Sequence, residues 1–123
     1  MLGGILGHAS QVSEKEIESD ISFLLLDDEK IEIAFKMVRD LFVFTDKRLI
    51  LLDKQGLTGH KKEYRFIPYK HISYFSIETA GHFDLDSELR IWITGHQVPI
   101  KKELKKDTNI EALQKILAKH ILK

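Results

Sequence analysis

The residues best suited to chemistry in this chain are His82, Asp84 and Asp86, which alternate in the stretch HFDLD. Alternate side chains of an extended segment point to the same side, so this spacing would present one nitrogen and two carboxylates to a metal ion. The neighbouring sequence does not supply the rest of a coordination shell. We therefore interpret the stretch as a solvated loop that leads into a strand, and we predict no metal site.

Catalytic patterns are also absent from the sequence. Asp84, Asp86 and Glu88 are the candidates for paired carboxylates in acid–base catalysis. Strand spacing places all three on one face, however, and provides no opposing surface to complete a catalytic cleft. The chain has no cysteine, which excludes disulfides, thiol nucleophiles and thiolate metal sites. The GLTG stretch at 56–59 lacks the Lys-Ser/Thr of a phosphate loop, and there is no nucleophile elbow. We expect a protein that is not an enzyme and uses no cofactor.

Basic residues gather in HKK at 60–62 and in KKELKK at 101–106. In the second run, the candidate contacts for an anionic ligand are Lys101, Lys102, Lys105 and Lys106. The alternative is a solvated strand edge on which lysine blocks unwanted strand pairing, and the neighbouring acidic residues favour it. Lys plus Arg and Asp plus Glu are each 19, and this formal net charge of zero disfavours binding to nucleic acid.

Alternating hydrophobicity predicts the strands that would position these residues. The stretch KIEIAFKMV at 30–38 predicts a half-buried strand with Ile31, Ile33, Phe35 and Met37 on one face. In DLFVFTDKRLILLD, at 40–53, two segments rich in β-branched and aromatic residues flank a polar turn, which predicts a tight antiparallel hairpin. The remaining strands are expected at 63–69, 71–79, 88–93 and 98–104. Seven consecutive strands predict an antiparallel barrel or sandwich.

Helices are expected at both ends of the chain. Ser13 and Glu16 have the spacing of a capping box and predict a short N-terminal helix. Thr108 and Glu111 repeat that spacing, with Asp107 or Thr108 as N-cap of a closing helix at 107–122. The apolar stripe of this helix comprises Ile110, Leu113, Ile116, Leu117 and Ile121. Such a stripe must pack against an open end or face of the barrel.

The chain has more apolar residues than a small barrel can bury on one face of each strand. Both faces of LFVF (41–44) and LILL (49–52) are apolar, so the N-terminal segment, a neighbouring subunit or both must cover the outer one. Trp92 lies opposite the apolar stripe of its own strand and is a second candidate contact, unless it is folded under the closing helix. We predict Phe42, Phe44 and Trp92 as contacts with another subunit or partner.

Length and composition indicate one domain. A chain of 123 residues builds a single core, with an N-terminal segment at 1–27, the barrel at 30–104 and the capping helix at 107–122. The N-terminal MLGGILGHASQ has no basic n-region and is a poor signal peptide. No apolar run approaches the ~20 residues of a transmembrane helix. We expect a cytoplasmic, single-domain protein.

Several stretches resemble a known family, the bacterial pleckstrin-homology-like domains. They are FTDKRLILLD (44–53), GLTGHKKEYRFIPYKHISYFSIETAG (56–81), FDLDSELRIWI (83–93) and the closing helix. The resemblance implies a strongly bent seven-stranded barrel capped by the C-terminal helix. Because single-domain members are similar to subunits of cyclic rings, it also implies a cyclic homo-oligomer, with a pentamer favoured over a dimer.

The resemblance implies no ligand, since fold does not give function. The loop MVRDL (37–41) is too short and too neutral to hold an inositol phosphate in the manner of lipid-binding pleckstrin-homology domains. We expect a non-enzymatic, self-associating interaction module of unknown ligand, whose partner is a second copy of itself. The alternative is a peripheral membrane or anionic-lipid-binding domain that uses the lysines of 101–106, and an unknown protein or peptide partner stays open.

Overall fold

Seven strands and a C-terminal helix form the part of the chain that the computed structural model describes, which is residues 21–37, 40–55, 60–79, 87–105 and 108–122. The strands are β1 (Ile31–Lys36), β2 (Asp40–Thr45), β3 (Arg48–Gln55), β4 (Lys61–Pro68), β5 (Ile72–Glu78), β6 (Ser87–Ile93) and β7 (Ile100–Leu104). The helix is α2 (Ile110–Ile121), and two short 3-10 turns are η1 (Ser22–Leu24) and η2 (Tyr69–His71).

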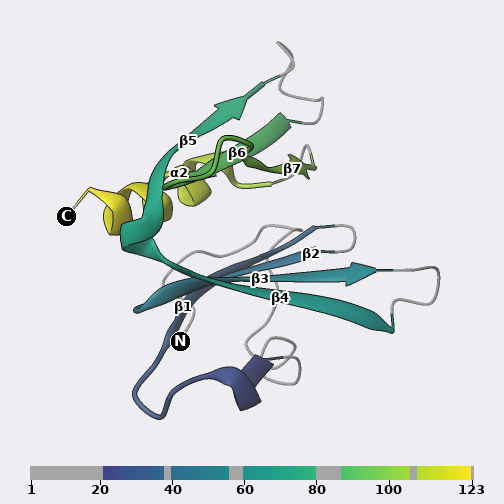
Figure 1. The fold of residues 1–123 in the computed structure, drawn as a ribbon, viewed down its shortest axis with the longest axis vertical. Helices are drawn as coiled ribbons and strands as arrows, with labels where there is room; N and C mark the ends of the chain where they lie inside the picture. Colours follow the sequence, from purple (N-terminus) through teal and green to yellow (C-terminus); the bar gives the residue numbers. More distant parts are fainter. Residues whose placement is uncertain (1–20, 38–39, 56–59, 80–86, 106–107, 123) are drawn as a thin grey trace.

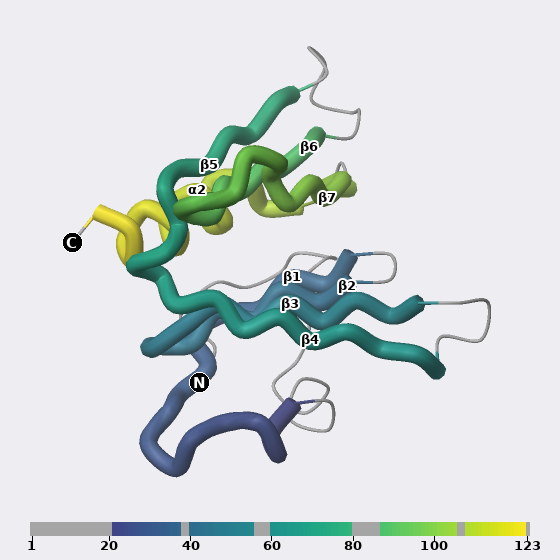
Figure 2. The backbone as a smooth tube through the Cα atoms, in the orientation of Figure 1, coloured from purple at the N-terminus to yellow at the C-terminus, as the bar shows by residue number. Residues whose placement is uncertain are grey.

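The strands form two antiparallel sheets that pack as layers (Figure 1). Sheet A has the order β1-β2-β3-β4, and sheet B has the order β5-β6-β7. The chain passes from one layer to the other at a corner, where β4 ends at Pro68 and η2 leads into β5 (Figure 2). The two layers diverge from this corner, so the subunit has the shape of a wedge. The predicted seven-stranded antiparallel fold with a closing helix is confirmed.

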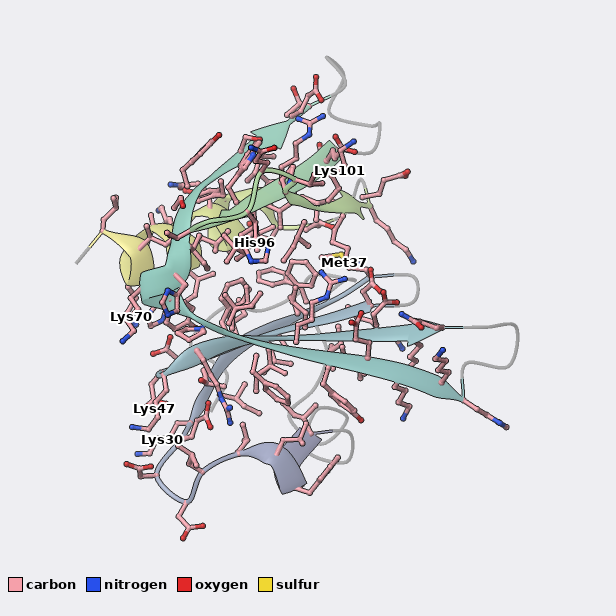
Figure 3. All side chains as sticks on the ribbon, in the orientation of Figure 1. Lys30, Met37, Lys47, Lys70, His96 and Lys101 are labelled. Atoms are coloured by element: carbon pink, nitrogen blue, oxygen red, sulfur yellow. The ribbon has the colours of Figure 1, made fainter. Side chains whose placement is uncertain are left out.

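The main core lies between the two sheets and the helix. Its largest fully buried side chains include Phe35, Phe42, Phe44, Leu89 and Ile91. Phe35 and Phe44 meet edge to face, with ring centroids 6.1 Å apart. The sulfur of Met37 lies between the layers (Figure 3). Alternation along the strands therefore places one face of each sheet inside, as expected for half-buried strands.

One face assignment in the first strand was wrong. Ile33, Phe35 and Met37 belong to the main core, but Ile31 packs with the residues on the other side of sheet A. The pairing of β1 with β2 shifts register between Ile31 and Ile33, and such an irregularity turns the side chain before it to the opposite face. A two-residue period cannot show this shift.

The N-cap of the closing helix lies one residue after Thr108, the first residue of the predicted capping box. Asn109 is the N-cap, and its side chain accepts a hydrogen bond from the backbone N–H of Ala112 at 3.1 Å. The hydroxyl of Thr108 is buried and has no partner among the described residues, so the capping role predicted for Thr108 or Asp107 was wrong. The predicted stripe is confirmed, because Leu113 and Leu117 are fully buried in the main core.

The predicted N-terminal helix from Ser13 to Ser19 lies outside the described residues. Within the described part, the segment before β1 contains the 3-10 turn η1, which lies beyond sheet A on the side away from sheet B (Figure 1). This segment covers the outer face of sheet A. The covered cluster comprises Ile21, Leu24 and Leu25 on one side and Ala34, Leu41, Val43, Ile50 and Leu52 on the other.

Candidate functional site

The outer face of sheet B carries an aromatic pair. Tyr74 and Trp92 are register partners on β5 and β6, and their rings stack with centroids 4.3 Å apart and planes 10° from parallel. Tyr74 is 56% exposed and Trp92 is partly exposed. Trp92 belongs to neither hydrophobic cluster of the described residues, so it is not folded under the helix in the manner of a core side chain. The Tyr74–Trp92 pair is thus an uncovered aromatic surface.

Charged side chains lie next to the Tyr74–Trp92 pair on the same face, farther along the strands of sheet B. Arg90 forms ion pairs with Glu78, at 2.8 Å, and with Glu88. The hydrogen bond that Arg90 donates to Glu78 is the main reason that the pKa of Arg90 is raised. Pairing of β6 with β7 places Lys101 opposite Arg90 and Glu103 opposite Glu88 on this face. The face therefore has an aromatic pair with charged residues next to it, and these are the kinds of side chain found in the core and the rim of protein interfaces.

The two other predicted partner contacts lie inside the subunit. Phe42 and Phe44 are fully buried on the inner face of sheet A, in the main core. The opposite face of the same strand, with Leu41 and Val43, is covered by the chain's own N-terminal segment. The apolar side chains on both faces of 41–44 and 49–52 are therefore covered within one subunit. Neither Phe42 nor Phe44 is accessible to a second subunit.

A buried carboxylate holds the N-terminal segment against the β2–β3 turn. Glu29 receives two hydrogen bonds from the Arg48 guanidinium, both at 2.9 Å, and one from the Thr45 hydroxyl at 2.6 Å. The Oε1 atom, which accepts one of the Arg48 bonds, also accepts from the backbone N–H of Leu26. Burial alone would raise the pKa of Glu29, but these hydrogen bonds outweigh burial and the pKa is lowered. We call this set of contacts the Glu29 tie.

A second exposed aromatic cluster lies beside this tie. Phe23, Tyr64 and Phe66 are linked ring to ring: Phe23 meets Tyr64 edge to face at 6.4 Å, and Tyr64 stacks on Phe66 at 6.3 Å. The guanidinium of Arg48 lies over the Phe66 ring, 5.1 Å from its centroid. Phe23 is 71% exposed and Phe66 is 42% exposed. This Phe23–Tyr64–Phe66 cluster is the aromatic surface of the outer side of sheet A.

Two of the four predicted lysines lie at a groove between the two layers, where β4 faces β7 and the loop before β7. The groove has a volume of about 570 Å³, and its apolar lining includes Ile67, Ile93 and Ile100. Lys101 and Lys102 line it, together with Arg65 and His96. Figure 3 shows His96 and Lys101 on the side of sheet B. Lys105 is exposed beyond the end of β7, and Lys106 lies outside the described residues.

Lys102 is not free to bind an external anion. Its ammonium lies 3.0 Å from the Asp40 carboxylate and 3.7 Å from that of Asp53, so it joins sheet B to sheet A. Burial is the main reason that the pKa of Asp40 is raised, and the neighbouring Asp53 adds to the shift. Of the three predicted lysines that the structure describes, Lys101 and Lys105 have no ion pair.

A third polar cluster ties the closing helix to the corner. The His120 ring stacks on Tyr69 with centroids 3.9 Å apart, and its Nε2 lies 2.6 Å from a carboxylate oxygen of Glu32. The Tyr69 hydroxyl donates to the backbone oxygen of Thr45 at 2.6 Å. Burial, followed by the charge of Glu32, raises the pKa of Tyr69. Because Tyr69 and His120 are both buried, this cluster joins elements and has no open site for a substrate.

The metal and acid–base candidates cannot be placed. His82, Asp84 and Asp86 lie outside the described residues, and Glu88 is engaged with Arg90. Within the described ranges, no group of three or more His, Asp or Glu side chains is arranged to hold a metal ion. In the same ranges, no helix has the length and apolarity needed to cross a membrane.

Sequence reasoning missed Tyr74, Glu29 and the pair of Tyr69 with His120. Tyr74 had a signal, since it shares its strand face with polar Ser76 and Glu78, as an exposed aromatic would. Glu29 and Arg48 are 19 residues apart, and their pairing follows from no local pattern. Tyr69 and His120 meet only because the helix returns to the corner.

Comparison with known proteins supports the fold over almost the entire chain. The family model described as Bacterial PH domain matches residues 1–121. The chain is 58% identical over 118 residues to "Uncharacterized protein YjqA" of Bacillus subtilis (strain 168), which covers 95% of this chain and 94% of that protein. Its sequence thus matches that relative nearly end to end.

Solved structures give the same result. A pleckstrin homology domain from Shewanella amazonensis SB2B is 51% identical, with a TM-score of 0.82 over 95% of this chain and 94% of that one. A DUF1696 family protein with a pleckstrin-homology domain from Shewanella loihica PV-4 is 46% identical, with a TM-score of 0.81 over 94% and 99%. The names of the two Shewanella proteins describe a domain, and none of the three names assigns a reaction.

Proposed function

Because this chain belongs to the bacterial PH domain family, we propose that it is a non-enzymatic module that self-associates into a cyclic homo-oligomer. The observation that carries the proposal is the Tyr74–Trp92 pair, an exposed aromatic surface on a sheet face that no described element covers. Tyr and Trp are enriched at protein interfaces, where large rings bury much area at little entropic cost. A ring of five subunits is our preferred state, on the strength of the family resemblance.

The test measures the mass of the native oligomer, first in the wild type and then in a variant with a charge introduced at the Tyr74–Trp92 pair. Native mass spectrometry and light scattering should report a single oligomer for the wild type. Trp92→Glu would bury an unpaired carboxylate in the interface and should raise the concentration for half-dissociation by about a hundredfold or more. Gln114→Glu is the matched control, because it adds the same charge on an exposed position of α2.

Circular dichroism of both variants should match the wild type, since both positions are at least partly exposed and neither is in the core. A wild-type protein that stays monomeric at tens of micromolar in physiological salt contradicts the proposal. If Trp92→Glu leaves the oligomer intact, Trp92 does not belong to the interface. Another surface must then hold the subunits together.

The groove between β4 and β7 favours a second candidate function, the binding of an anionic lipid headgroup. Arg65 and His96 line this groove above an apolar floor. Vesicles containing anionic lipid should then bind the protein in a salt-sensitive manner, and Arg65→Glu should abolish the binding. Lys115→Glu, on the exposed side of α2, is the control. Equal binding by both variants would contradict a headgroup site in the groove.

A further inference from the structure

A cluster of opposite charges joins the two sheets at the open end of the wedge (Figure 1). The register of β2 and β3 places Asp40 opposite Asp53, and alternation along both strands points the two carboxylates inward. From β7, the ammonium of Lys102 lies 3.0 Å from the Asp40 carboxylate and 3.7 Å from that of Asp53. All three side chains are partly buried. We call these three residues the Lys102 clasp.

The Lys102 clasp forms part of the wall of the groove between β4 and β7. Lys102 lines the groove, and so do Arg65 and Glu63. Both cations are engaged, because Lys102 contacts two carboxylates and Arg65 pairs with Glu63 at 3.4 Å. An anion that enters the groove must therefore compete with the two aspartates for Lys102, and their negative charge repels it.

The other charged groups that face the Lys102 clasp come from β4 and from the loop before β7. Glu63 is the register partner of Asp53, and Arg65 and Lys61 share its inward face of β4. His96 lines the groove from the loop. The residues of β1 and β6 that belong to the main core carry no charge. Carboxylates and cations on these inward faces are thus equal in number, so one added proton gives the groove an excess of positive charge.

We propose that proton uptake by Asp40 and Asp53 releases Lys102 to the groove, so that binding of an anionic phosphate group there is coupled to protonation. The inference rests on the proposed headgroup function of the groove and adds its regulation. When two adjacent carboxyl groups share one proton, the acid donates to the remaining carboxylate and their repulsion ends. Lys102 has a flexible four-carbon stem, so its ammonium can then turn from the aspartates toward a phosphate in the groove.

The direction of the coupling follows from the surroundings of Asp40. Burial is the main cause that raises the pKa of Asp40, and the adjacent Asp53 raises it further, against the effect of Lys102. The two carboxyls therefore take up their first proton above the pH of about 3.9 at which an ordinary aspartate does. Anion binding that uses Lys102 must then strengthen as the pH falls, and a bound anion must raise the pKa of the two carboxyls by linkage.

The proton uptake is measured first, on the protein without ligand. An NMR titration of the aspartate side-chain carbons should show Asp40 and Asp53 titrating together, with the first proton taken up above about pH 3.9. The side-chain signals of Lys102 should move in the same step, because its contacts change. Titration of both carboxyls at or below the ordinary value would overturn the proposal.

The coupling is measured with phosphatidylcholine vesicles that contain phosphatidylglycerol. Asp53→Asn imitates the protonated clasp and should bind these vesicles about tenfold more tightly than the wild type at pH 7. This advantage should disappear at low pH, where the wild-type clasp is already protonated. Because the comparison is made at each pH, the titration of His96 affects both proteins alike. Asp40→Asn should behave in the same way, and replaces Asp53→Asn if circular dichroism shows that the latter does not fold.

Glu103→Gln is the matched control. It removes the same charge from an exposed position next to Lys102 on β7, but on the outer face of sheet B, and should keep the affinity and the pH dependence of the wild type. An equal gain in Glu103→Gln and Asp53→Asn would assign the effect to net charge and overturn the proposal. An advantage of Asp53→Asn that is the same at every pH would also overturn it.

Two further outcomes separate this inference from the headgroup function. Vesicle binding in which Asp53→Asn has no advantage would refute the regulation and leave the headgroup function standing. Absence of binding by all these proteins at every pH, both to vesicles and to soluble glycerol phosphate, would refute the two together. If the advantage of Asp53→Asn appears with glycerol phosphate as well, the phosphate alone is recognised, and if it appears only with vesicles, the ligand is a membrane lipid. Either result supports the coupling.

Discussion

At the residue scale, the fold depends on a few polar side chains that connect segments distant in the sequence. Glu29 accepts hydrogen bonds from Arg48 and Thr45 and so fastens the N-terminal segment to the β2–β3 turn. Removal of one member of such a buried set leaves the other polar groups without partners. The free-energy cost of these unpaired groups exceeds the net contribution of the hydrogen bonds to stability. The Glu29 tie is therefore expected to be sensitive to single substitutions.

The Glu29 tie predicts a pH-dependent stability. Glu29→Gln should lower the free energy of unfolding at pH 7 by about 1.5–3 kcal/mol, the value of hydrogen bonds to a charged group. Because the pKa of Glu29 is lowered in the folded protein, its contribution is complete above the unfolded pKa of about 4.3 and is lost as the pH falls through the folded value. The difference between wild type and variant, measured by urea unfolding, should therefore shrink below about pH 4.

The control for this prediction is Glu63→Gln. Glu63 is exposed and pairs with exposed Arg65 at 3.4 Å, so its replacement should change stability by less than about 1 kcal/mol at any pH. If Glu29→Gln has the same small effect at pH 7, the carboxylate does not fasten the N-terminal segment.

The Tyr69 hydroxyl offers a second test at this scale. Tyr69→Phe removes the hydroxyl that donates to the backbone oxygen of Thr45 at 2.6 Å. The loss of this donor should lower the free energy of unfolding by about 1–3 kcal/mol. Tyr64→Phe removes a hydroxyl that has no hydrogen bond to any described residue, and should change the free energy of unfolding by less than about 0.5 kcal/mol. Equal effects in thermal or chemical unfolding would argue against the Tyr69 bond.

At the element scale, the closing helix is part of the core. Leu113 and Leu117 are fully buried among side chains of both sheets, and His120 and Tyr69 join the end of the helix to the corner. A helix of 12 residues is marginal in isolation, so its stability comes from this packing.

Leu117→Ala should therefore lower the free energy of unfolding by about 2–5 kcal/mol, since it removes a packed core side chain and leaves a cavity. Gln114→Ala, on the exposed side of the same helix, should have an effect near zero. Both can be measured by chemical unfolding followed by circular dichroism. An unchanged unfolding midpoint in Leu117→Ala would mean that the helix does not cap the core.

At the scale of the whole molecule, self-association should appear as stability that depends on concentration. Only the folded subunit can associate with other copies, and the unfolded chain cannot. Association therefore stabilises the fold by mass action. The Tm of the wild type should rise by about 3–6 °C for each tenfold rise in protein concentration. The Tm of Trp92→Glu should be independent of concentration, and a wild-type Tm that is equally constant would count against assembly.

The sequence by itself determined the elements and their order. The two-residue alternation of 31–37 and 88–93, the polar turn at 45–48 and the helical stripe with Leu113 and Leu117 depend on local periods, and these periods were sufficient for seven strands and one helix. The sequence also indicated that the outer face of 41–44 and 49–52 needs a cover, because both faces of those strands are apolar.

The tertiary structure decided which residues meet. Phe42 and Phe44 turned out to face the core, because the register of β1 and β2 places them beside Ile33 and Phe35, and the N-terminal segment covers the other side. The Glu29 tie, the stack of Tyr69 on His120 and the pairing of Tyr74 with Trp92 join positions far apart in the chain. Such contacts depend on the bend at the corner and on strand register, which are set by the packing of the whole core and leave no period in the sequence.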